Sequence, residues 1–312
     1  KGVAESRKLR QSQNIMEGIM TLNRNCHSTA TIGELVDSFL RANQGFISDH
    51  TIEWYYYYLR PLREAIGDFE ISKISTDQLL SVFHMLDDGE HSRYTLSNYV
   101  RSWRRFFRWC LDEGFIHHNP AQKLRKPPLP KKSPAGISED DLSQLLQAAQ
   151  YSTLPERNTA LILFLADTGA RLGGAASLTL DHLDLVNRRA LVTEKGRGGK
   201  RERIVFLSPR VINALKKWLV VRGEQADERV FLLSPNGIYQ VLERLAKKAG
   251  VKGRWNPHSF RHAYARKLLR EGVSIGVVSH LMGHSSVTVT LDFYGRFSGD
   301  ELQMIYDKVM KD

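Results

Sequence analysis

The sequence predicts a mostly α-helical protein with one small β-sheet, divided into two domains. Apolar residues recur at helical spacing through most of the chain, whereas two neighbouring segments within residues 190–207 have the character of strands. Between the two halves, residues 124–138 (LRKPPLPKKSPAGIS) contain four prolines interleaved with four basic residues. Because proline interrupts a helix, this segment predicts an extended, stiff and positively charged linker.

These breaks divide the chain into five segments. The last of them has Leu302, Ile305 and Val309 at helical spacing, and such a helix can dock on a neighbouring protomer or fold back on its own domain. The first residue is Lys rather than Met, so a longer N-terminus stays an open alternative. The predicted segments are a basic tail (1–26), a helical domain (27–123), the linker (124–138), a second domain (139–295) and the C-terminal helix (296–312).

The composition points to a polyanionic partner. The 312 residues include 45 Lys and Arg against 34 Asp and Glu, a net charge of +11 with a pI near 9.6, which favours nucleic acid. Cys26 and Cys110 offer no disulfide framework, which indicates a reducing compartment. The longest strongly apolar run, residues 160–166, is too short to span a bilayer. We therefore expect a cytoplasmic protein with no membrane partner.

The most informative segment of the first domain is SNYVRSWRRFFRWCLDEG, residues 97–114. Its apolar residues predict a buried helical stripe, and its arginines fall largely on the other side. No acid interrupts them before Asp112, which favours a phosphate-contacting face over a solvated face of mixed charge. The aromatic run WYYYYL (54–59) is better explained by helix packing than by base stacking. The predicted stripe is Val100, Trp103, Phe107, Cys110 and Leu111, and the candidate DNA-binding arginines are Arg101, Arg104, Arg105 and Arg108.

The second domain is predicted to combine helices with a small sheet. Ser138 is a suitable N-cap for the helix that follows it, and Gly169 ends the buried helix NTALILFLADTGA. The segments ALVTEK and RERIVFL predict a hairpin around the turn GRGGK, with a long, mobile and basic tip. Pro209 begins another helix, and further helices follow from Ser234 onward, separated by Gly250, Gly272, Gly283 and Gly295.

Four places in the second domain combine polar side chains with glycine breaks. An arginine that directly follows a helix-ending glycine is held by the scaffold, and two such guanidinium groups can each bind phosphate oxygens through paired hydrogen bonds. The four are TGARLGG with Arg171, EKGRGGK with Lys195, HSFRH with His258 and Arg261, and LMGHSSVTVTLDFYG with His284 and Tyr294.

A metal site is not favoured by this pattern. His258 and His262 are four residues apart, as in zinc-binding helices, but Ser259 stands where a metalloprotease has glutamate, and Arg261 would place a cation beside the metal. The sequence also lacks a phosphate-binding loop that ends in Lys-Ser or Lys-Thr. We therefore expect neither a metal nor another cofactor.

The same side chains suit phosphoryl transfer on a diester. That reaction needs positive groups around the non-bridging oxygens, a nucleophile, and a proton for the leaving alcohol. Two arginines supply the first and a tyrosine phenol can be the second, while a lysine on the hairpin can donate the proton. Histidines can hydrogen-bond the phosphate or move the phenolic proton. Taken singly, Tyr294 is better explained as a core phenol. Arg171 could equally be a helix C-cap and His284 a histidine bonded to the backbone, but the joint order of these residues favours a site.

In order and spacing, these motifs resemble the four signatures of the tyrosine recombinase family (phage-integrase-type, Xer-like). The resemblance covers residues 27–295, and the segment NYVRSWRRFFRWCLDEGFIHHNPA is similar to the family's core-binding segment, including Asn119, Pro120 and Ala121. The motif spacings that carry it are 24 residues from Arg171 to Lys195, 23 from Arg261 to His284 and ten from His284 to Tyr294.

The resemblance implies a fold and a set of partners. It predicts an N-terminal helical, SAM-like core-binding domain and an α+β catalytic domain, which close as a C-shaped clamp around DNA. It implies a site-specific recombinase that acts in integration, excision or resolution without ATP or metal. The implied partners are double-stranded DNA and three further copies of the chain in a synaptic tetramer. An accessory directionality protein is a further partner that the resemblance allows.

The resemblance also implies a role for each motif residue. Tyr294 attacks the scissile phosphate and forms a 3′-phosphotyrosyl bond, and Lys195 protonates the leaving 5′-oxygen. His262 and Arg266 are expected to stabilise their helix or to contact the backbone elsewhere. In the remaining roles, Arg171 and Arg261 clamp the phosphate, His258 assists proton transfer, His284 hydrogen-bonds the phosphate, and Lys200 and Arg201 of the hairpin contact DNA.

One position departs from the family pattern. The family commonly carries an acid three residues after the first arginine, and this chain has Gly174 there. We expect either a less rigid Arg171 region with a lower rate, or another acid, such as Asp181, in its place. Two alternative functions use the same fold: a type IB-like topoisomerase, which relaxes any supercoiled DNA as a monomer, and a non-catalytic DNA-binding regulator, which would require neither Tyr294 nor Lys195.

Overall fold

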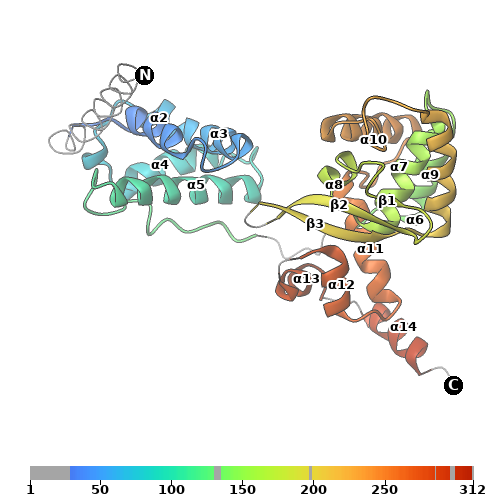
Figure 1. Cartoon of the computed structure of the whole chain (residues 1–312). Helices are drawn as coiled ribbons and strands as arrows, with labels where there is room; N and C mark the ends of the chain where they lie inside the picture. Colours follow the sequence, from blue (N-terminus) through green and yellow to red (C-terminus); the bar gives the residue numbers. More distant parts are fainter. Residues whose placement is uncertain (1–28, 130–134, 197–198, 285, 296–298, 311–312) are drawn as a thin grey trace, which may run out of the picture. The chain divides into compact units, whose positions relative to one another are not determined.

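The computed structural model describes residues 29–129, 135–196, 199–284, 286–295 and 299–310. The chain separates into two compact units, which divide between Lys131 and Lys132, inside the proline-rich segment (Figure 1). The predicted basic tail and part of the predicted linker lie outside the described residues. Among the described residues, no helix is both long and apolar enough to cross a membrane.

The first unit is helical, as the sequence predicts. Side chains before the helices set where they begin: Thr31 and Glu34 form a reciprocal capping box, and Ser75 and Gln78 form another. Its elements are α2 (Ile32–Asn43), α3 (Asp49–Ile66), the short 3-10 helix Ile71–Lys73, α4 (Thr76–Leu86) and α5 (Arg93–Asp112).

The core of the first unit is built on α5. The predicted stripe is confirmed at Val100, Trp103, Phe107 and Cys110, which are buried, while Leu111 packs against the core and is only partly buried. The spacing missed Phe106, which is also buried and contacts the ring of Phe39 on α2 edge to face.

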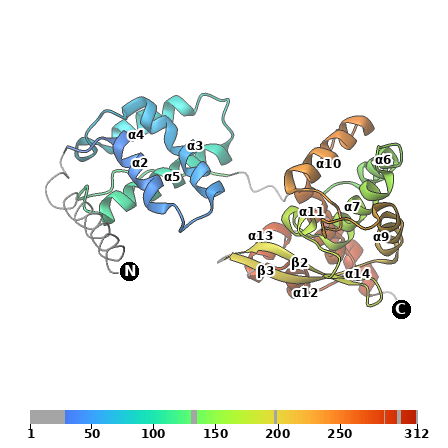
Figure 2. The ribbon, with the colours of Figure 1, turned by 45° about the horizontal axis from the view of Figure 1, so that its top comes forward.

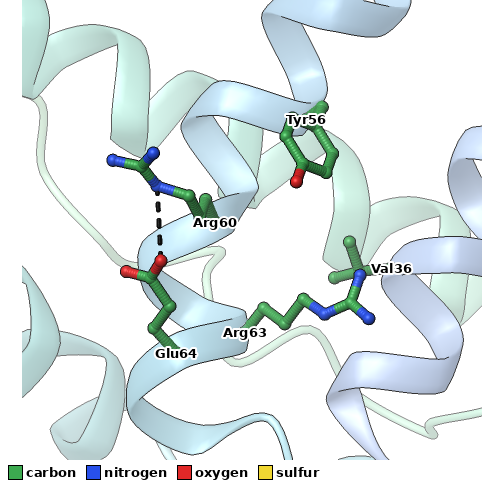
Figure 3. A pocket seen from close by; sticks show the side chains of 5 residues that line it. All are labelled: Val36, Tyr56, Arg60, Arg63 and Glu64. Carbon is green, nitrogen blue, oxygen red and sulfur yellow. Dashed lines mark ion pairs between the residues drawn. The ribbon is translucent and has the colours of Figure 1, made fainter.

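The aromatic run on α3 serves mainly as packing, as predicted. Tyr55 and Tyr58 pack against the core, whereas Tyr56 and Tyr57 are exposed. Tyr56 lines a surface pocket between α2 and α3 together with Val36 and two arginines (Figure 3). Both arginines are paired with carboxylates, Arg60 with Glu64 and Arg63 with Asp37. Because their charge is compensated, we do not place the chemistry of the protein in this pocket.

The second unit surrounds one largely buried helix, α7 (Pro155–Thr168). Contacts with α6, α9, α11 and α8 cover it on several sides, and Figures 1 and 2 show α9 beside it. Ser138 is the N-cap of α6, and Gly169 ends α7 in a left-handed conformation with φ 58°, both as predicted. The helices are α6 (Glu139–Gln150), α7, α8 (Leu172–Ala176), α9 (Pro209–Arg222), α10 (Pro235–Ala249), α11 (Pro257–Arg270), α12 (Ile275–Met282), α13 (Val287–Tyr294) and α14 (Gly299–Val309).

The sheet has three antiparallel strands in the order β1-β2-β3. These are β1 (Leu183–Asp184), β2 (Arg189–Gly196) and β3 (Gly199–Phe206). The expected long tip of the hairpin is wrong: pairing continues to Gly196 opposite Gly199, and the two residues between them lie outside the described part of the chain. The glycines and lysines at the ends of β2 and β3 still pair through their backbones. Both strands are therefore longer than the glycine-rich composition of this segment suggested.

The C-terminal helix α14 lies against α11 of its own unit. Lys308 on α14 pairs with Glu271, the residue that follows α11. This contact is the one that the fold-back alternative expects. Leu302 and Tyr306 are exposed on α14, and docking on a neighbouring protomer stays a prediction.

Candidate active site

Arg171 is held in place by the turn that ends α7. Gly169 adopts a left-handed backbone there, and a Cβ atom on it would lie 2.5 Å from the ring of Tyr264. Glycine is thus required both for the turn and for the close approach of α11. Two residues later Arg171 becomes the N-cap of α8, with its side chain partly exposed.

Glu194 on β2 fixes Arg171 from the opposite side. Its carboxylate accepts hydrogen bonds from the Arg171 backbone N–H at 2.7 Å and from Arg171 Nη1 at 2.5 Å. A third bond comes from Arg203 Nη2 at 2.9 Å. Burial, at 3% exposure, would raise the pKa of Glu194, but the charge and hydrogen bond of Arg203 and the bond from the Arg171 backbone outweigh it and hold the pKa below its ordinary value.

Arg261 lies buried behind this pair, on α11. Its Nη1 donates to the Gly169 carbonyl at 2.6 Å, and its Nη2 donates to the Met282 carbonyl at the end of α12. Burial and the positive charge of Arg171 lower the pKa of Arg261 to about 9, against the opposing effect of Glu194. The guanidinium therefore keeps its charge at neutral pH, and two of its five N–H groups are used by these carbonyls.

Arg203 joins the cluster from β3, and sequence reasoning missed it. Besides Glu194 it binds the Leu281 carbonyl through Nη1, and its buried Nε has no partner in the described structure. A signal was available: Arg203 shares a strand face with the buried Val205, so alternation places its charge on the inward face.

A pocket of about 620 Å³ opens in front of these groups. Arg171, Glu194, Arg203 and His284 line it, so the structure brings together residues from four separate parts of the sequence. Its charged lining consists of Arg171, Arg201 and Arg203 against Glu194 and the exposed Glu202, and histidines and apolar residues form the rest of the wall. The excess of arginine suits an anionic group of a ligand.

The histidines of the site are neutral at physiological pH. His284 Nδ1 shares a hydrogen bond of 2.7 Å with the hydroxyl of the buried Thr290. Burial and the charges of Arg261 and Arg171 lower the pKa of His284 to about 4. His258, in the first turn of α11, has its pKa lowered in the same direction by burial and then by Arg261 and Arg171. A neutral imidazole can donate a hydrogen bond from one ring nitrogen and accept one at the other without adding positive charge to the arginine cluster.

Tyr294 is buried, at 1% exposure, among Ala265, Val278 and Met282. Its hydroxyl is hydrogen-bonded to Nδ1 of His262, although the sequence had assigned His262 a role away from the site. Burial raises the pKa of Tyr294 to about 12, with Arg261 and Arg266 acting against this. The phenol is thus protonated and does not line the pocket, but it lies close enough for the charge of Arg261 to act on it.

The remaining predicted residues fall on the hairpin and on α5. Lys195 on β2 pairs with Lys200 on β3, and Lys200 and Arg201 are exposed; the side chain of Lys195 is outside the described structure. On α5, Arg104 donates to the carbonyls of Gln122 and Leu124, so it fastens the following segment. The other three are exposed: Arg101 lies over the Trp54 ring, Arg108 pairs with Asp112, and Arg105 completes the set.

The acid that compensates for Gly174 is not Asp181. The Asp181 side chain is 68% exposed and its nearest described cation is His182, at 3.9 Å. Glu194, one residue before Lys195, instead occupies the position beside Arg171. Among the described residues, no group of three or more His, Cys, Asp or Glu side chains is arranged to hold a metal ion.

Comparison with known proteins decides the family. The model of the phage integrase family matches residues 136–298, more than half of the chain. The chain belongs to the phage integrase family. It is 29% identical to the tyrosine recombinase XerC of Alcanivorax borkumensis over 288 residues, which cover 88% of this chain and 92% of that protein. It is 27% identical to the tyrosine recombinase XerD of Oceanobacillus iheyensis, covering 81% and 89% of the two chains.

Solved structures give the same fold for this phage integrase family member. The XerH site-specific recombinase, bound to a palindromic difH substrate in a post-cleavage complex, superposes with a TM-score of 0.73 at 18% identity. The superposition covers 91% of this chain and 98% of that chain. This likeness confirms the predicted fold, mostly helical with a small sheet. The family match and the recombinase relatives confirm the predicted family and the class of tyrosine site-specific recombinase.

The histidine pKa values of this integrase predict a loss of stability in acid. The pKa of His262 is lowered to about 4, first by burial and then by the charges of His258 and Arg261. The pKa of His284 is lowered to a similar value. Between pH 6.5 and 4 the unfolded chain therefore binds more protons than the folded chain, so the free energy of unfolding decreases as the pH falls. Each histidine accounts for about 3 kcal/mol.

Thermal unfolding between pH 8 and pH 4 tests this. The Tm should be nearly constant above pH 7 and decrease steadily below 6.5, and His262→Gln should remove part of that decrease. A Tm that does not change from pH 7 to pH 4.5 would contradict the neutral state of both histidines.

Proposed function

We propose that this recombinase cuts and rejoins duplex DNA at specific sites with Tyr294 as its nucleophile. The phenolic oxygen attacks the scissile phosphorus, an O–P ester forms, and the bond from phosphorus to the 5′-oxygen breaks. The phenolic proton passes to a neutral histidine, and Lys195 gives a proton to the 5′-oxygen. Because the phosphotyrosyl ester keeps the free energy of the diester, a 5′-hydroxyl can reverse the step without ATP.

The observation that carries this proposal is the fixed cation cluster beside the pocket. Arg171 and Arg203 are held by one carboxylate, and Arg261 is held by two backbone carbonyls. Positive groups that are already in place stabilise the charge that develops on the non-bridging oxygens without reorganising during the reaction. His284 at the pocket wall adds a hydrogen-bonding group for the same phosphate.

The buried hydroxyl of Tyr294 implies that the described arrangement is a closed one. We place the cleavage step after a movement of α13 that breaks the bond to His262 and brings the phenol to the pocket. His262 is neutral and the phenol is protonated, so Tyr294 forms an ion pair with neither His262 nor Arg261. Its release therefore does not have to separate opposite charges.

Double-stranded DNA is the proposed partner, in keeping with the palindromic difH substrate that XerH binds. On the first unit, Arg105 and Arg101 are exposed on α5 and suited to phosphate contact. Alanine at Arg105 should weaken binding to all duplexes alike and reduce its salt dependence, whereas a loss confined to one sequence would indicate base recognition. Two pairs of protomers would assemble on two sites in the cytoplasm, with an accessory directionality protein where one direction is favoured.

Mapping the covalent bond tests the function. The protein is incubated with nicked duplexes taken from the DNA that flanks its gene, then denatured and digested, and the nucleotide-bearing peptide is sequenced by mass spectrometry. We expect a 3′-linked nucleotide on the peptide that contains Tyr294. A linkage at another residue, or none with any duplex, would overturn the proposal. Relaxation of an unrelated supercoiled plasmid by monomers would indicate the topoisomerase alternative instead.

A further inference from the structure

Gly174 and Glu194 compete for the same space beside Arg171. Gly174 lies on α8, three residues after Arg171, and Glu194 reaches it from β2. A Cβ atom on Gly174 would lie 2.9 Å from Glu194 Cγ, 3.1 Å from its Oε1 and 3.3 Å from the Val192 Cβ. Real Cβ atoms do not approach a side chain so closely, so a side chain at 174 requires Glu194 to move.

The Glu194 carboxylate is the one acid within hydrogen-bonding distance of the described arginines of the cluster. It accepts two bonds from Arg171 and one from Arg203, and it is buried. Its charge raises the pKa of Arg261, whereas Arg171 and Arg203 lower it. Glu194 therefore offsets the mutual repulsion of three guanidinium groups that would otherwise move apart.

We propose that Glu194 is the positioning residue of this active site and that residue 174 is glycine so that Glu194 can reach Arg171. The acid is supplied from β2 rather than from α8, where the family pattern had led us to expect it. This inference rests on the proposed function for its catalytic consequence, while its steric part concerns stability alone. In the proposed reaction Glu194 acts on the phosphate through Arg171 and Arg203, which donate hydrogen bonds to it.

Three single variants and one double variant test the exchange. Glu194→Ala should lower the single-turnover rate of adduct formation at saturating DNA about 100-fold, because Arg171 loses its orientation. Gly174→Ala should lower it about tenfold, because the new Cβ displaces Glu194. Gly174→Glu combined with Glu194→Ala supplies a carboxylate from α8 to the vacated space, and it should recover most of the rate lost in Glu194→Ala. Glu194→Gln, which keeps the volume, should lose the rate as Glu194→Ala does.

Two matched controls separate positioning from general disturbance. Gly173→Ala changes the neighbouring glycine of α8, where a Cβ would meet no atom within 4 Å, and it should leave rate and Tm unchanged. Asp181→Asn removes the exposed acid of the same region and should also have no effect. If the role of Glu194 were purely structural, the rate at saturating DNA would change in proportion to the fraction of folded protein. Such a role would not explain a recovered rate in the double variant Gly174→Glu/Glu194→Ala.

The steric part has a measurement that needs no activity. Gly174→Ala should lower the Tm in the presence of Glu194 and leave it unchanged, or raise it, in the Glu194→Ala background. The inference is overturned if Gly174→Ala changes the Tm equally in the two backgrounds. It is also overturned if the double variant Gly174→Glu/Glu194→Ala forms the adduct no faster than Glu194→Ala. If the unmodified protein forms no adduct at all, the proposed function fails instead, and the Tm comparison alone decides whether Gly174 makes room for Glu194.

Discussion

Replacing Tyr294 with phenylalanine is expected to abolish covalent adduct formation completely, with the protein folded and DNA binding unchanged. The ring is buried, and phenylalanine fills the same volume, so the packing of α13 is kept. The lost hydroxyl is the only group that forms the ester in the proposed step, and no residual rate from that residue can remain. The measurement is adduct formation on a nicked duplex, resolved on a denaturing gel.

Tyr239→Phe on α10 is the matched control, because it removes a phenol from an exposed tyrosine of the same unit. It should cleave at the wild-type rate.

The Tyr294 variant should also change stability in alkali. Folding raises the pKa of Tyr294 to about 12, so the free energy of unfolding of the wild type decreases between pH 10 and pH 12. Tyr294→Phe should show a smaller decrease, and the part that remains comes from Tyr99 and Tyr264, whose pKa values are also raised. An adduct that persists in Tyr294→Phe would mean that another side chain attacks.

Replacing Arg261 with lysine is expected to reduce the rate of adduct formation about 100- to 1000-fold while the charge is retained. Lysine cannot bind the carbonyls of Gly169 and Met282 and a phosphate oxygen at once, because its donors share one nitrogen. The carbonyl left without a donor costs about 1–3 kcal/mol of stability. Single-turnover kinetics at saturating DNA separate the loss of rate from a loss of affinity.

Arg222→Lys provides a control with the same kind of disturbance. Arg222 is equally buried and binds the carbonyls of Gly223, Asp227 and Arg229. Its described hydrogen bonds thus lie away from Arg171 and Glu194, whose charges act on Arg261. It should lose comparable stability and keep the rate of the folded enzyme. If Arg222→Lys and Arg261→Lys slow the reaction equally, the effect of Arg261 is one of folding, and its role in charge stabilisation is wrong.

The closed position of Tyr294 joins these two predictions. Arg261 takes part in both. Its hydrogen bonds to two carbonyls connect the end of α7 with the end of α12, and its charge acts on the phenol of Tyr294. A site that holds its nucleophile protonated and buried avoids attack on unsuitable phosphates. Movement of α13 would then be the step that commits bound DNA to cleavage.

Motif order in the sequence was enough to predict two residues that the structure brings to one pocket. Arg171 follows the helix-ending Gly169 as expected, and His284 and Arg171 line one pocket. The α5 stripe was also predictable, since burial on one helical face follows directly from spacing. Arg104 shows the limit of that argument: it lies on the polar side of the helix, yet it binds the carbonyls of Gln122 and Leu124.

Glu194, Arg203 and His262 could not be assigned in the same way. Strand alternation places Glu194 beside the buried Ala190 and Val192, which signals an inward charge but does not name its partner. The partners come from α8 and β3, and the bond from His262 joins α11 to α13. Such pairings depend on how elements distant in the chain pack together.

The sequence by itself determined the family and the helical character with one hairpin, because residue type, order and local periodicity are carried along the chain. The set of phosphate-binding and nucleophilic residues is its prediction. Only the tertiary structure decided which acid fixes Arg171 and where Tyr294 rests. Both are contacts between separate elements, and the first depends on a volume as small as the missing Cβ of Gly174. Close packing turns that small difference into a choice between two sources of the same carboxylate.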